Sequence, residues 1–347
     1  MALEVSIQKR LGSFLLDVSF STEHEMLALL GASGCGKSMT LKCIAGIETP
    51  DRGRIVLNGR VLFDSEQNIN LPPQKRRVGY LFQNYALFPN MTVFQNILAG
   101  AKGASRQEKF VSTQEHIRAF RLEGLENKRP TQLSGGEQQR TALARIFASE
   151  PELLLLDEPF SALDGYLKWQ VELELADLLR PFDGDVVYVS HSRDEVYRLC
   201  SHVCVLSRGH SEPKEATKTL FAAPGSVDAA LISGCKNISR IKKVDSHTVF
   251  CTDWGVTLNT AAEVGEDVTW VGVRAHYIRP AQPGDDNILP CRVRRVIDDV
   301  FSTVVMLSAA DDASTLLRME LSKQEIPWEP IQVSIRPEDV MLLTGKR

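Results

Sequence analysis

The sequence predicts an α/β protein with two domains, the first built on a largely parallel sheet and the second rich in β-strands. Three observations support this fold class. A glycine-rich loop joins an apolar run ending at Leu30 to a helical pattern that starts near Lys37. Strand-like and helical patterns then alternate, which is typical of parallel sheets with crossover helices. After about residue 234, short strand-like runs dominate the chain.

Length and composition narrow the class of protein. The chain has 347 residues, 43% of them hydrophobic and 24% charged, which suits two or three folded domains with real cores. The formal net charge of −4 argues against a nucleic-acid-binding protein, since duplex binders normally present a basic surface. The seven cysteines are scattered without CxxC pairs, so we expect a reducing compartment and no zinc site. Neither a signal peptide nor an apolar run of about 18 residues is found, so we expect no membrane span.

The first domain is expected to cover residues 1–234. It should begin with strands at 3–8, 13–20 and 25–32, followed by short strands and turns over 51–82. Residues 84–140 change to helical patterns, which we interpret as a helical insertion into the sheet. Strand-like runs return at 153–159 and 185–192, with a helix-forming stretch at 166–179 between them.

The second domain is expected to cover residues 235–347. Two of its segments resemble each other, VGVRAHYIRPA at 271–281 and VSIRPEDVMLL at 333–343. This echo predicts two similar lobes, each like a small barrel. The alternative is chance, because short β-segments resemble one another easily.

The glycine-rich loop, Gly31–Ser38, fits the pattern GxxxxGK[ST] in the required place between a strand and a helix. Its glycines let successive backbone N–H groups turn toward a phosphate, and the helix N-terminus adds partial positive charge. Lys37 would reach the β- and γ-phosphates, and the Ser38 hydroxyl would ligate Mg²⁺. The expected nucleotide-binding residues are Gly31, Ala32, Ser33, Gly34, Cys35, Gly36, Lys37, Ser38 and Met39.

An acidic pair follows the apolar run Leu153–Leu156, at the end of a predicted buried strand. Ligand sites of α/β sheets lie at such carboxyl ends. Asp157 would hold the metal through water, and Glu158 would accept a proton from the attacking water. An apolar run before Asp-Glu is by itself more often a plain strand end, but its place about 120 residues after Lys37 favours the functional interpretation.

A second anion-binding helix N-terminus is predicted at Leu133–Arg140, which reads LSGGEQQR. Ser134 as N-cap would explain the stability of this helix. It would not explain why the motif accompanies a phosphate-binding loop.

With these motifs in this order, residues 1–235 resemble the ATP-binding subunit of an ABC transporter. The other family motifs are matched by Gln83, by Ser161–Asp164 and by His191. The resemblance implies that ATP and Mg²⁺ are bound, with Ser38, Gln83 and Asp157 at the metal. It also implies that Glu158, His191 and Gln83 take part in hydrolysis. A lone His191 would more often be a satisfied residue at a strand end.

The resemblance further implies a homodimer in which ATP lies between the loop of one subunit and Ser134, Gly135 and Gly136 of the other, with Asp164 nearby. Part of the apolar stretch Asn84–Leu98 would line a groove for a helix of a membrane permease. We therefore expect a peripheral protein at the cytoplasmic face of the cell membrane. Its complex would include permease subunits and an extracytoplasmic substrate-binding protein, and no nucleic acid.

Two positions depart from the family pattern. Leu11 stands where many members stack an aromatic ring on the adenine, and Phe14 is the nearby substitute. Met39 stands where many members have a phosphate-contacting threonine. Both changes are expected to loosen contacts with the nucleotide without abolishing its use.

The second domain resembles the TOBE/MOP-like regulatory domain of importer ATPases. Residues 55–93 and the segment GCKNIS at 234–239 are most similar to molybdate importers, so we expect uptake of a small oxyanion, molybdate first. Sulfate, iron or polyamine import is the alternative. Lys236, Asn237 and Ser239 could donate to an anion, although solvated turn residues are the favoured interpretation.

Two rival functions come from other classes. A soluble ABC ATPase of DNA repair or translation would typically carry paired ATPase domains or long coiled-coil arms. The present chain has one phosphate-binding loop and a β-rich tail. A non-catalytic binding module conflicts with the presence of both Glu158 and His191.

Overall fold

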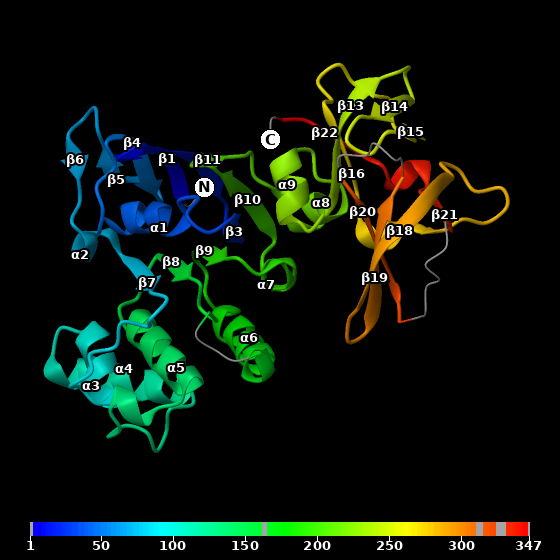
Figure 1. Ribbon diagram of the computed structural model, residues 1–347. Coiled ribbons are helices and arrows are strands. Elements are labelled where there is room, and N and C mark those ends of the chain that lie inside the picture. The colour runs from blue at the N-terminus through cyan, green and yellow to red at the C-terminus, as the bar shows by residue number, and fades with distance from the viewer. Residues whose placement is uncertain (1–2, 162–164, 310–314, 324–330, 346–347) are drawn as a thin grey trace. The chain divides into compact units, whose positions relative to one another are not determined.

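The computed structural model describes residues 3–161, 165–309, 315–323 and 331–345 (Figure 1). The chain folds into two compact units, Met1–Thr217 and Lys218–Arg347. The boundary therefore falls earlier than the position 234/235 suggested by the sequence pattern. Helix α9 (Val227–Ile232) and all but the first residue of α8 (Thr217–Ala222) belong to the second unit.

The first unit is built on a twelve-stranded sheet, with the order β6-β5-β4-β1-β2-β11-β10-β3-β9-β8-β7 and with β12 paired to β10. The strands β10, β3, β9, β8 and β7 run parallel, whereas β1, β2, β4, β5 and β6 pair antiparallel. Their bounds are β1 Leu3–Leu11, β2 Phe14–Thr22, β3 Met26–Leu30, β4 Arg52–Leu57, β5 Arg60–Asp64, β6 Ile69–Asn70, β7 Val78–Leu81, β8 Leu153–Asp157, β9 Asp185–Ser190, β10 His202–Ser207, β11 His210–Ser211 and β12 Glu215–Ala216.

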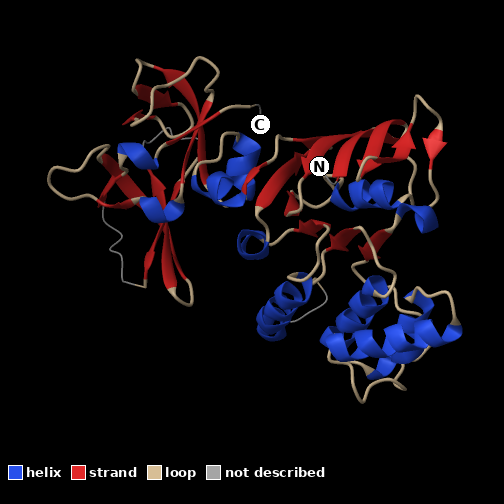
Figure 2. Cartoon of the chain, turned by 180° about the vertical axis from the view of Figure 1, so that it is seen from behind, coloured by secondary structure: helices blue, strands red, loops and turns tan. Residues whose placement is uncertain are grey.

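Three helices form the insertion between β7 and β8, and Figure 2 shows them gathered beside the sheet. Side-chain caps explain where they begin: Thr92, Ser105 and Ser134 each accept a hydrogen bond from a backbone N–H of the first turn. The helices of the first unit are α1 Lys37–Ala45, α2 Pro73–Arg76, α3 Val93–Gly100, α4 Arg106–Ala119, α5 Gly135–Phe147, α6 Gly165–Leu179 and α7 Arg193–Leu199, with a 3₁₀ turn at Pro130–Gln132.

The parallel strands place the site. Every residue of β8 and β9 is buried, because apolar runs of this kind are covered on both faces. The register pairs Leu156 with Leu81, Asp157 with Val189, and Leu30 with Ser190. The segments that leave β3, β7, β8 and β9 therefore emerge at one edge of the sheet.

The second unit contains two five-stranded sheets, β15-β14-β13-β16-β22 and β17-β21-β18-β19-β20. Together with the mixed first unit, this confirms the predicted fold class. The bounds are β13 Asn237–Lys243, β14 Thr248–Cys251, β15 Val256–Asn259, β16 Trp270–Val273, β17 Arg279–Pro280, β18 Leu289–Asp298, β19 Ser302–Ser308, β20 Leu317–Ser322, β21 Ile331–Ser334 and β22 Met341–Leu343, with 3₁₀ turns η2 at Ala275–Tyr277 and η3 at Pro337–Asp339.

The two echoing segments have a shared structural role. Each forms a strand, a 3₁₀ turn and a second strand: β16–η2–β17 and β21–η3–β22. They run antiparallel, with Gly272 opposite Met341 and Arg279 opposite Ser334. Each segment therefore gives one strand to each sheet, so the two similar sequences occur at the two places where the chain crosses from one sheet to the other.

Within the described part of the chain, no helix is both long and apolar enough to cross a membrane.

Candidate functional site

The phosphate-binding loop follows β3 and ends in α1. Gly36 is the N-cap of α1, with φ at 109° and no side-chain cap, so the first-turn N–H groups are left to a ligand. A Cβ at Gly36 would also lie 2.4 Å from Leu16 Cδ1, so the end of that buried side chain would have to shift. The loop conformation thus requires glycine here.

Lys37 lies inside this loop. Its side chain is buried, and Nζ donates hydrogen bonds to the carbonyl oxygens of Gly31 (2.7 Å) and Ala32 (3.0 Å). The ammonium therefore lies against the loop backbone, where a phosphate oxygen would compete for its protons.

Asp157 is held by two hydroxyl groups. Ser38 Oγ donates to Oδ1 at 2.8 Å, and Tyr80 OH donates to Oδ2 at 2.9 Å. Burial, with the nearby Asp157 charge, raises the pKa of Tyr80 well above its usual value, so the phenol keeps its proton. An adjacent carboxylate and hydroxyl form the all-oxygen donor set that Mg²⁺ prefers.

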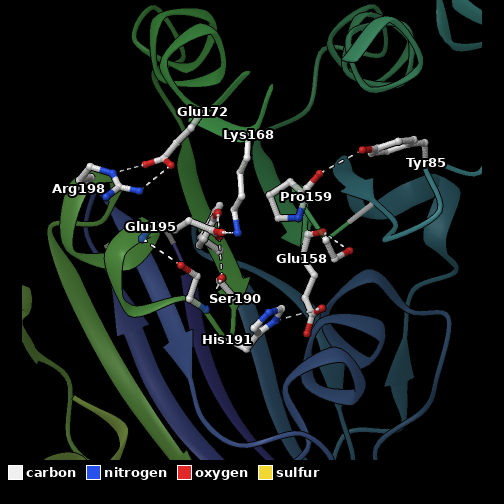
Figure 3. Close-up of polar contacts among 12 residues, drawn as sticks. Tyr85, Glu158, Pro159, Lys168, Glu172, Ser190, His191, Glu195 and Arg198 are labelled. Carbon is white, nitrogen blue, oxygen red and sulfur yellow. Dashed lines mark hydrogen bonds and ion pairs between the residues drawn. The ribbon is translucent and has the colours of Figure 1, made fainter. Parts of the chain in front are cut away.

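Glu158 and His191 come together at the open edge of the sheet (Figure 3). His191 Nδ1 lies 3.4 Å from Glu158 Oε2, and the two side chains are 58% and 22% exposed. The Glu158 backbone has φ at 46° and is fixed at both ends: its N–H donates to the Val189 carbonyl at 2.9 Å, and its carbonyl accepts from the Ser161 N–H and hydroxyl. With its backbone held in the left-handed conformation, Glu158 turns its side chain away from the strand and toward His191.

Gln83 lies in the turn after β7 and is exposed. The same turn is tied to the end of β8, since the buried Tyr85 donates from OH to the Pro159 carbonyl at 3.3 Å. Arg145 of α5 donates to the carbonyls of Ala86 (2.8 Å) and Tyr85 (3.1 Å). Gln83 thus lies on a segment braced between the acidic pair and the helical insertion.

The Ser134–Gly136 turn makes its hydrogen bonds within α5. Ser134 Oγ accepts from the Glu137 N–H, and Glu137 Oε2 accepts from the Ser134 N–H at 2.7 Å. The second bond lowers the pKa of Glu137. A Cβ on Gly136 would meet nothing closer than Val171 Cγ2 at 3.5 Å, an ordinary contact. Packing inside the subunit therefore does not require glycine at position 136.

Four other residues that the sequence analysis named remain, and one of them lies outside the described part of the chain. Leu11 is exposed at the tip of the β1–β2 hairpin, opposite Phe14. Phe14 and Met39 are half-buried and pack against the main core of the first unit. Asp164 lies outside the described residues.

Asn237 and Ser239 of the second unit are not available to an anion. Asn237 donates from Nδ2 to the carbonyls of Val273 and Arg318, and its Oδ1 accepts from the Arg318 N–H. Ser239 donates to the Arg240 carbonyl and accepts from the Asp253 N–H. Both are buried in β13, so their interpretation as solvated turn residues was wrong. Asn237 joins β13 to β16 and β20, and Ser239 bonds to its own strand and to the turn at Asp253. Lys236 is exposed.

Sequence reasoning missed Tyr80, Tyr85 and Arg145. Tyr80 sits in the run RRVGYLFQ, whose strand character was predicted, but its contact with Asp157 depends on the pairing of β7 with β8. The sequence indicates only that Tyr80 lies in a predicted strand, and it does not show that this strand pairs with the strand that ends at Asp157.

Comparison with known proteins gives concordant results. Residues 15–161 match the ABC transporter family. The chain is 40% identical over 223 residues to the molybdenum import ATP-binding protein ModC of Paramagnetospirillum magneticum, covering 64% of this chain and 61% of that protein. It is 39% identical to the Fe(3+) ions import ATP-binding protein FbpC of Haemophilus influenzae, over 68% of each.

Similarity also extends over almost the whole length. The spermidine/putrescine import ATP-binding protein PotA of Rubrobacter xylanophilus is 33% identical over 99% of this chain and 93% of its own. Among solved structures, a dimeric post-hydrolysis state of the ATP-binding cassette MJ0796 bound to ADP and Pi is 27% identical. It matches 62% of this chain with a TM-score of 0.52.

Proposed function

Because the chain belongs to the ABC transporter family, we propose that it is the ATP-hydrolysing subunit of an importer for a small oxyanion, molybdate first. The proposal rests on the way residues are arranged at one edge of the sheet, where the parallel strands end. There the Lys37 loop, the Ser38–Asp157 pair and the Glu158–His191 pair are brought together by the register of the parallel strands.

The chemistry follows from these groups. Lys37 and the N-terminus of α1 would bind the phosphates of ATP. Ser38, Asp157 and Gln83 would hold Mg²⁺, which neutralises charge on the phosphates when bound. Glu158 would accept the proton of the attacking water, with His191 beside it.

We propose that two copies act together, with Ser134, Gly135 and Gly136 of one copy completing the ATP site of the other. Two observations support this: Gly136 has room for a side chain within its own subunit, and the similar solved cassette is dimeric. The permease would contact the segment Asn84–Leu98, and the protein would lie at the cytoplasmic face of the membrane. A substrate-binding protein would complete the complex.

The choice of substrate rests on the relatives. Those named above import molybdenum, iron(III) and spermidine or putrescine, which favours an importer over an ATPase of DNA repair or translation. Molybdate is preferred because residues 55–93 and 234–239 are most similar to molybdate importers, whereas the identities of 40% to ModC and 39% to FbpC do not by themselves separate the two substrates. The matched part covers about six tenths of that ModC protein. We propose a regulatory role for the second unit.

The test is the variant Glu158→Gln. It should keep ATP binding but slow ATP hydrolysis about 10²–10⁴-fold, the usual worth of a positioned general base. Cells that carry it instead of the wild type should lose molybdate accumulation and keep iron and polyamine accumulation. The measurements are phosphate release by the purified protein and the cellular contents of molybdenum, iron and polyamines by mass spectrometry.

The control is Glu150→Gln, an exposed carboxylate whose nearest cation, Lys102, lies 3.8 Å away. It should behave as wild type in both assays. Near-normal turnover of Glu158→Gln would refute the role of the base, and loss of iron or polyamine uptake alone would refute molybdate as substrate.

A further inference from the structure

A buried carboxylate, Glu195 of α7, joins α6 to the end of β9 (Figure 3). Glu195 is 3% exposed, and its Oε2 accepts hydrogen bonds from Tyr188 OH and Ser190 Oγ, both at 2.7 Å. Its Oε1 forms an ion pair with Lys168. Burial by itself would raise the pKa of Glu195, but the bonds from Lys168, Ser190 and Tyr188 outweigh it and lower this pKa.

The Glu195 contacts reach the backbone on both sides of His191. Ser190, which precedes His191, directs its hydroxyl proton to Glu195, and its Oγ accepts the Ser192 N–H at 2.9 Å. Ser192 follows His191 and caps α7, its Oγ accepting from the Glu195 N–H at 3.5 Å. The carboxylate therefore fixes the residue before the histidine and, through it, the residue after.

Lys168 adds a link to the other half of the site. It lies in the first turn of α6, only ten residues after Glu158 along the chain. The ion pair with Glu195 thus connects the segment leaving β8, which carries Glu158, to the segment leaving β9, which carries His191. These are the two side chains that lie 3.4 Å apart at the sheet edge.

The same two helices carry a second ion pair that does not reach the site. Arg198 of α7 donates to both oxygens of Glu172 of α6, at 2.6 and 2.8 Å, and Glu172 is 2% exposed. Arg198 also lies over the Trp169 ring, 5.0 Å from its centroid. This pair holds α6 to α7 as the Lys168 pair does, but it has no contact with Ser190 or Ser192 among the interactions described.

We propose that Lys168 and Glu195 are positioning residues for ATP hydrolysis, which hold His191 in place through Ser190 and Ser192. The proposal rests on the proposed ATPase function. The competing explanation is a plain clamp between two helices, for which both ion pairs should matter alike.

The test compares full-length variants Lys168→Met and Arg198→Met, each of which removes a cation facing a buried glutamate. Lys168→Met should lower kcat about 10-fold with little change in KM for ATP, whereas Arg198→Met should change kcat less than about 2-fold. Lys168→Arg, which can restore the pair, should recover most of the kcat. Ser190→Ala leaves the ion pair in place and should lower kcat as Lys168→Met does.

A double-variant cycle makes the test specific to the histidine. In a His191→Ala background, Lys168→Met should cause no further loss of kcat, because the side chain that it positions is gone. An equal 10-fold loss in both backgrounds would overturn the proposal. So would equal losses from Lys168→Met and Arg198→Met.

One readout does not depend on ATP hydrolysis. The imidazole NMR signals of His191, assigned by their absence in His191→Ala, should shift in Lys168→Met and Ser190→Ala and stay in place in Arg198→Met. Unshifted signals in the first two variants would refute the positioning role even if the protein proved to hydrolyse no ATP. Inactive wild type with shifted signals would instead refute the proposed function alone.

Discussion

Among single residues, Asp157 shows which contacts the sequence motifs could predict and which they could not. Its position after an apolar strand and its distance along the chain from Lys37 predicted its nearness to Ser38, although its place at a metal stays a prediction. The Tyr80 contact could not be predicted, because it depends on which strand pairs with β8 and in which register. The same limit applies to Glu195, whose partner Lys168 lies 27 residues earlier on another helix.

Tyr80→Phe should raise the Mg²⁺ concentration needed for half-maximal ATPase activity by roughly 10–100-fold. Loss of the hydroxyl leaves Oδ2 of a buried aspartate without its donor, and outer-shell partners of metal ligands have effects of that size. The measurement is a Mg²⁺ titration of phosphate release at saturating ATP.

Tyr85→Phe is the matched control. It removes a buried hydroxyl that donates to the Pro159 carbonyl rather than to Asp157. Its Mg²⁺ requirement should shift less than that of Tyr80→Phe, because Asp157 keeps both donors and only the bond that ties the Gln83 turn to Pro159 is lost. Equal shifts in the two variants would mean that Tyr80 acts on general packing and not on Asp157.

Among the elements, the start of α5 was predicted from Ser134, which the sequence indicated as its N-cap. Ser134 with Glu137 three residues later marks the start of α5, and the structure has the reciprocal bonds of a capping box there. The pairing partners of β16 and β22 could not be predicted, because local patterns do not specify strands that meet across 70 residues of chain. The similarity of the two segments could be read from the sequence, but not its structural reason, which is that each segment connects the two sheets.

The start of α5 carries a prediction about two copies of the chain. Gly136→Asp should leave ATP binding intact, since a side chain fits within the subunit, but should abolish hydrolysis because its carboxylate would oppose the partner's ATP phosphates. Lys37→Ala should lose ATP binding itself. Mixing the two inactive proteins should restore activity, because each mixed dimer contains one intact composite site.

The mixture is measured by phosphate release against the two parents at equal total protein. Gly124→Asp provides a control for an added carboxylate at an unrelated glycine with open space around it, although its φ of 80° adds strain. If the mixture stays as inactive as its parents, then either the sites are not shared between copies or both must be intact.

In the whole molecule, the domain boundary is the main difference from the sequence pattern. The turn from helix to strand near residue 235 suggested a boundary there, yet α9 packs into the second unit. Val227 and Ala230 share a small core with Trp270 and Leu343, and Arg274 donates to carbonyls of Phe221 and Ser233. The sequence pattern changes near residue 235 because helix gives way to strand there. The second unit begins earlier, because α9 packs against its strands.

This packing predicts which fragment folds. Residues 218–347 should unfold in one cooperative thermal transition. Residues 235–347 should melt at a clearly lower temperature or without a transition, because Trp270 loses its apolar cover and Arg274 its acceptors. Circular dichroism at a β-sheet wavelength measures both. Identical melting curves of the two fragments would mean that the folded second domain begins at residue 235.

The crossing of the two echoing segments has a consequence for protein synthesis. The first sheet of the second unit gains its edge strand, β22, about 70 to 100 residues after its other strands have been made. A nascent chain that stops before Met341 therefore has β16 with an unpaired edge, and such edges recruit other chains. Synthesis must therefore pass β22 before this sheet can close, and a chain that stops earlier keeps an edge that is prone to aggregation.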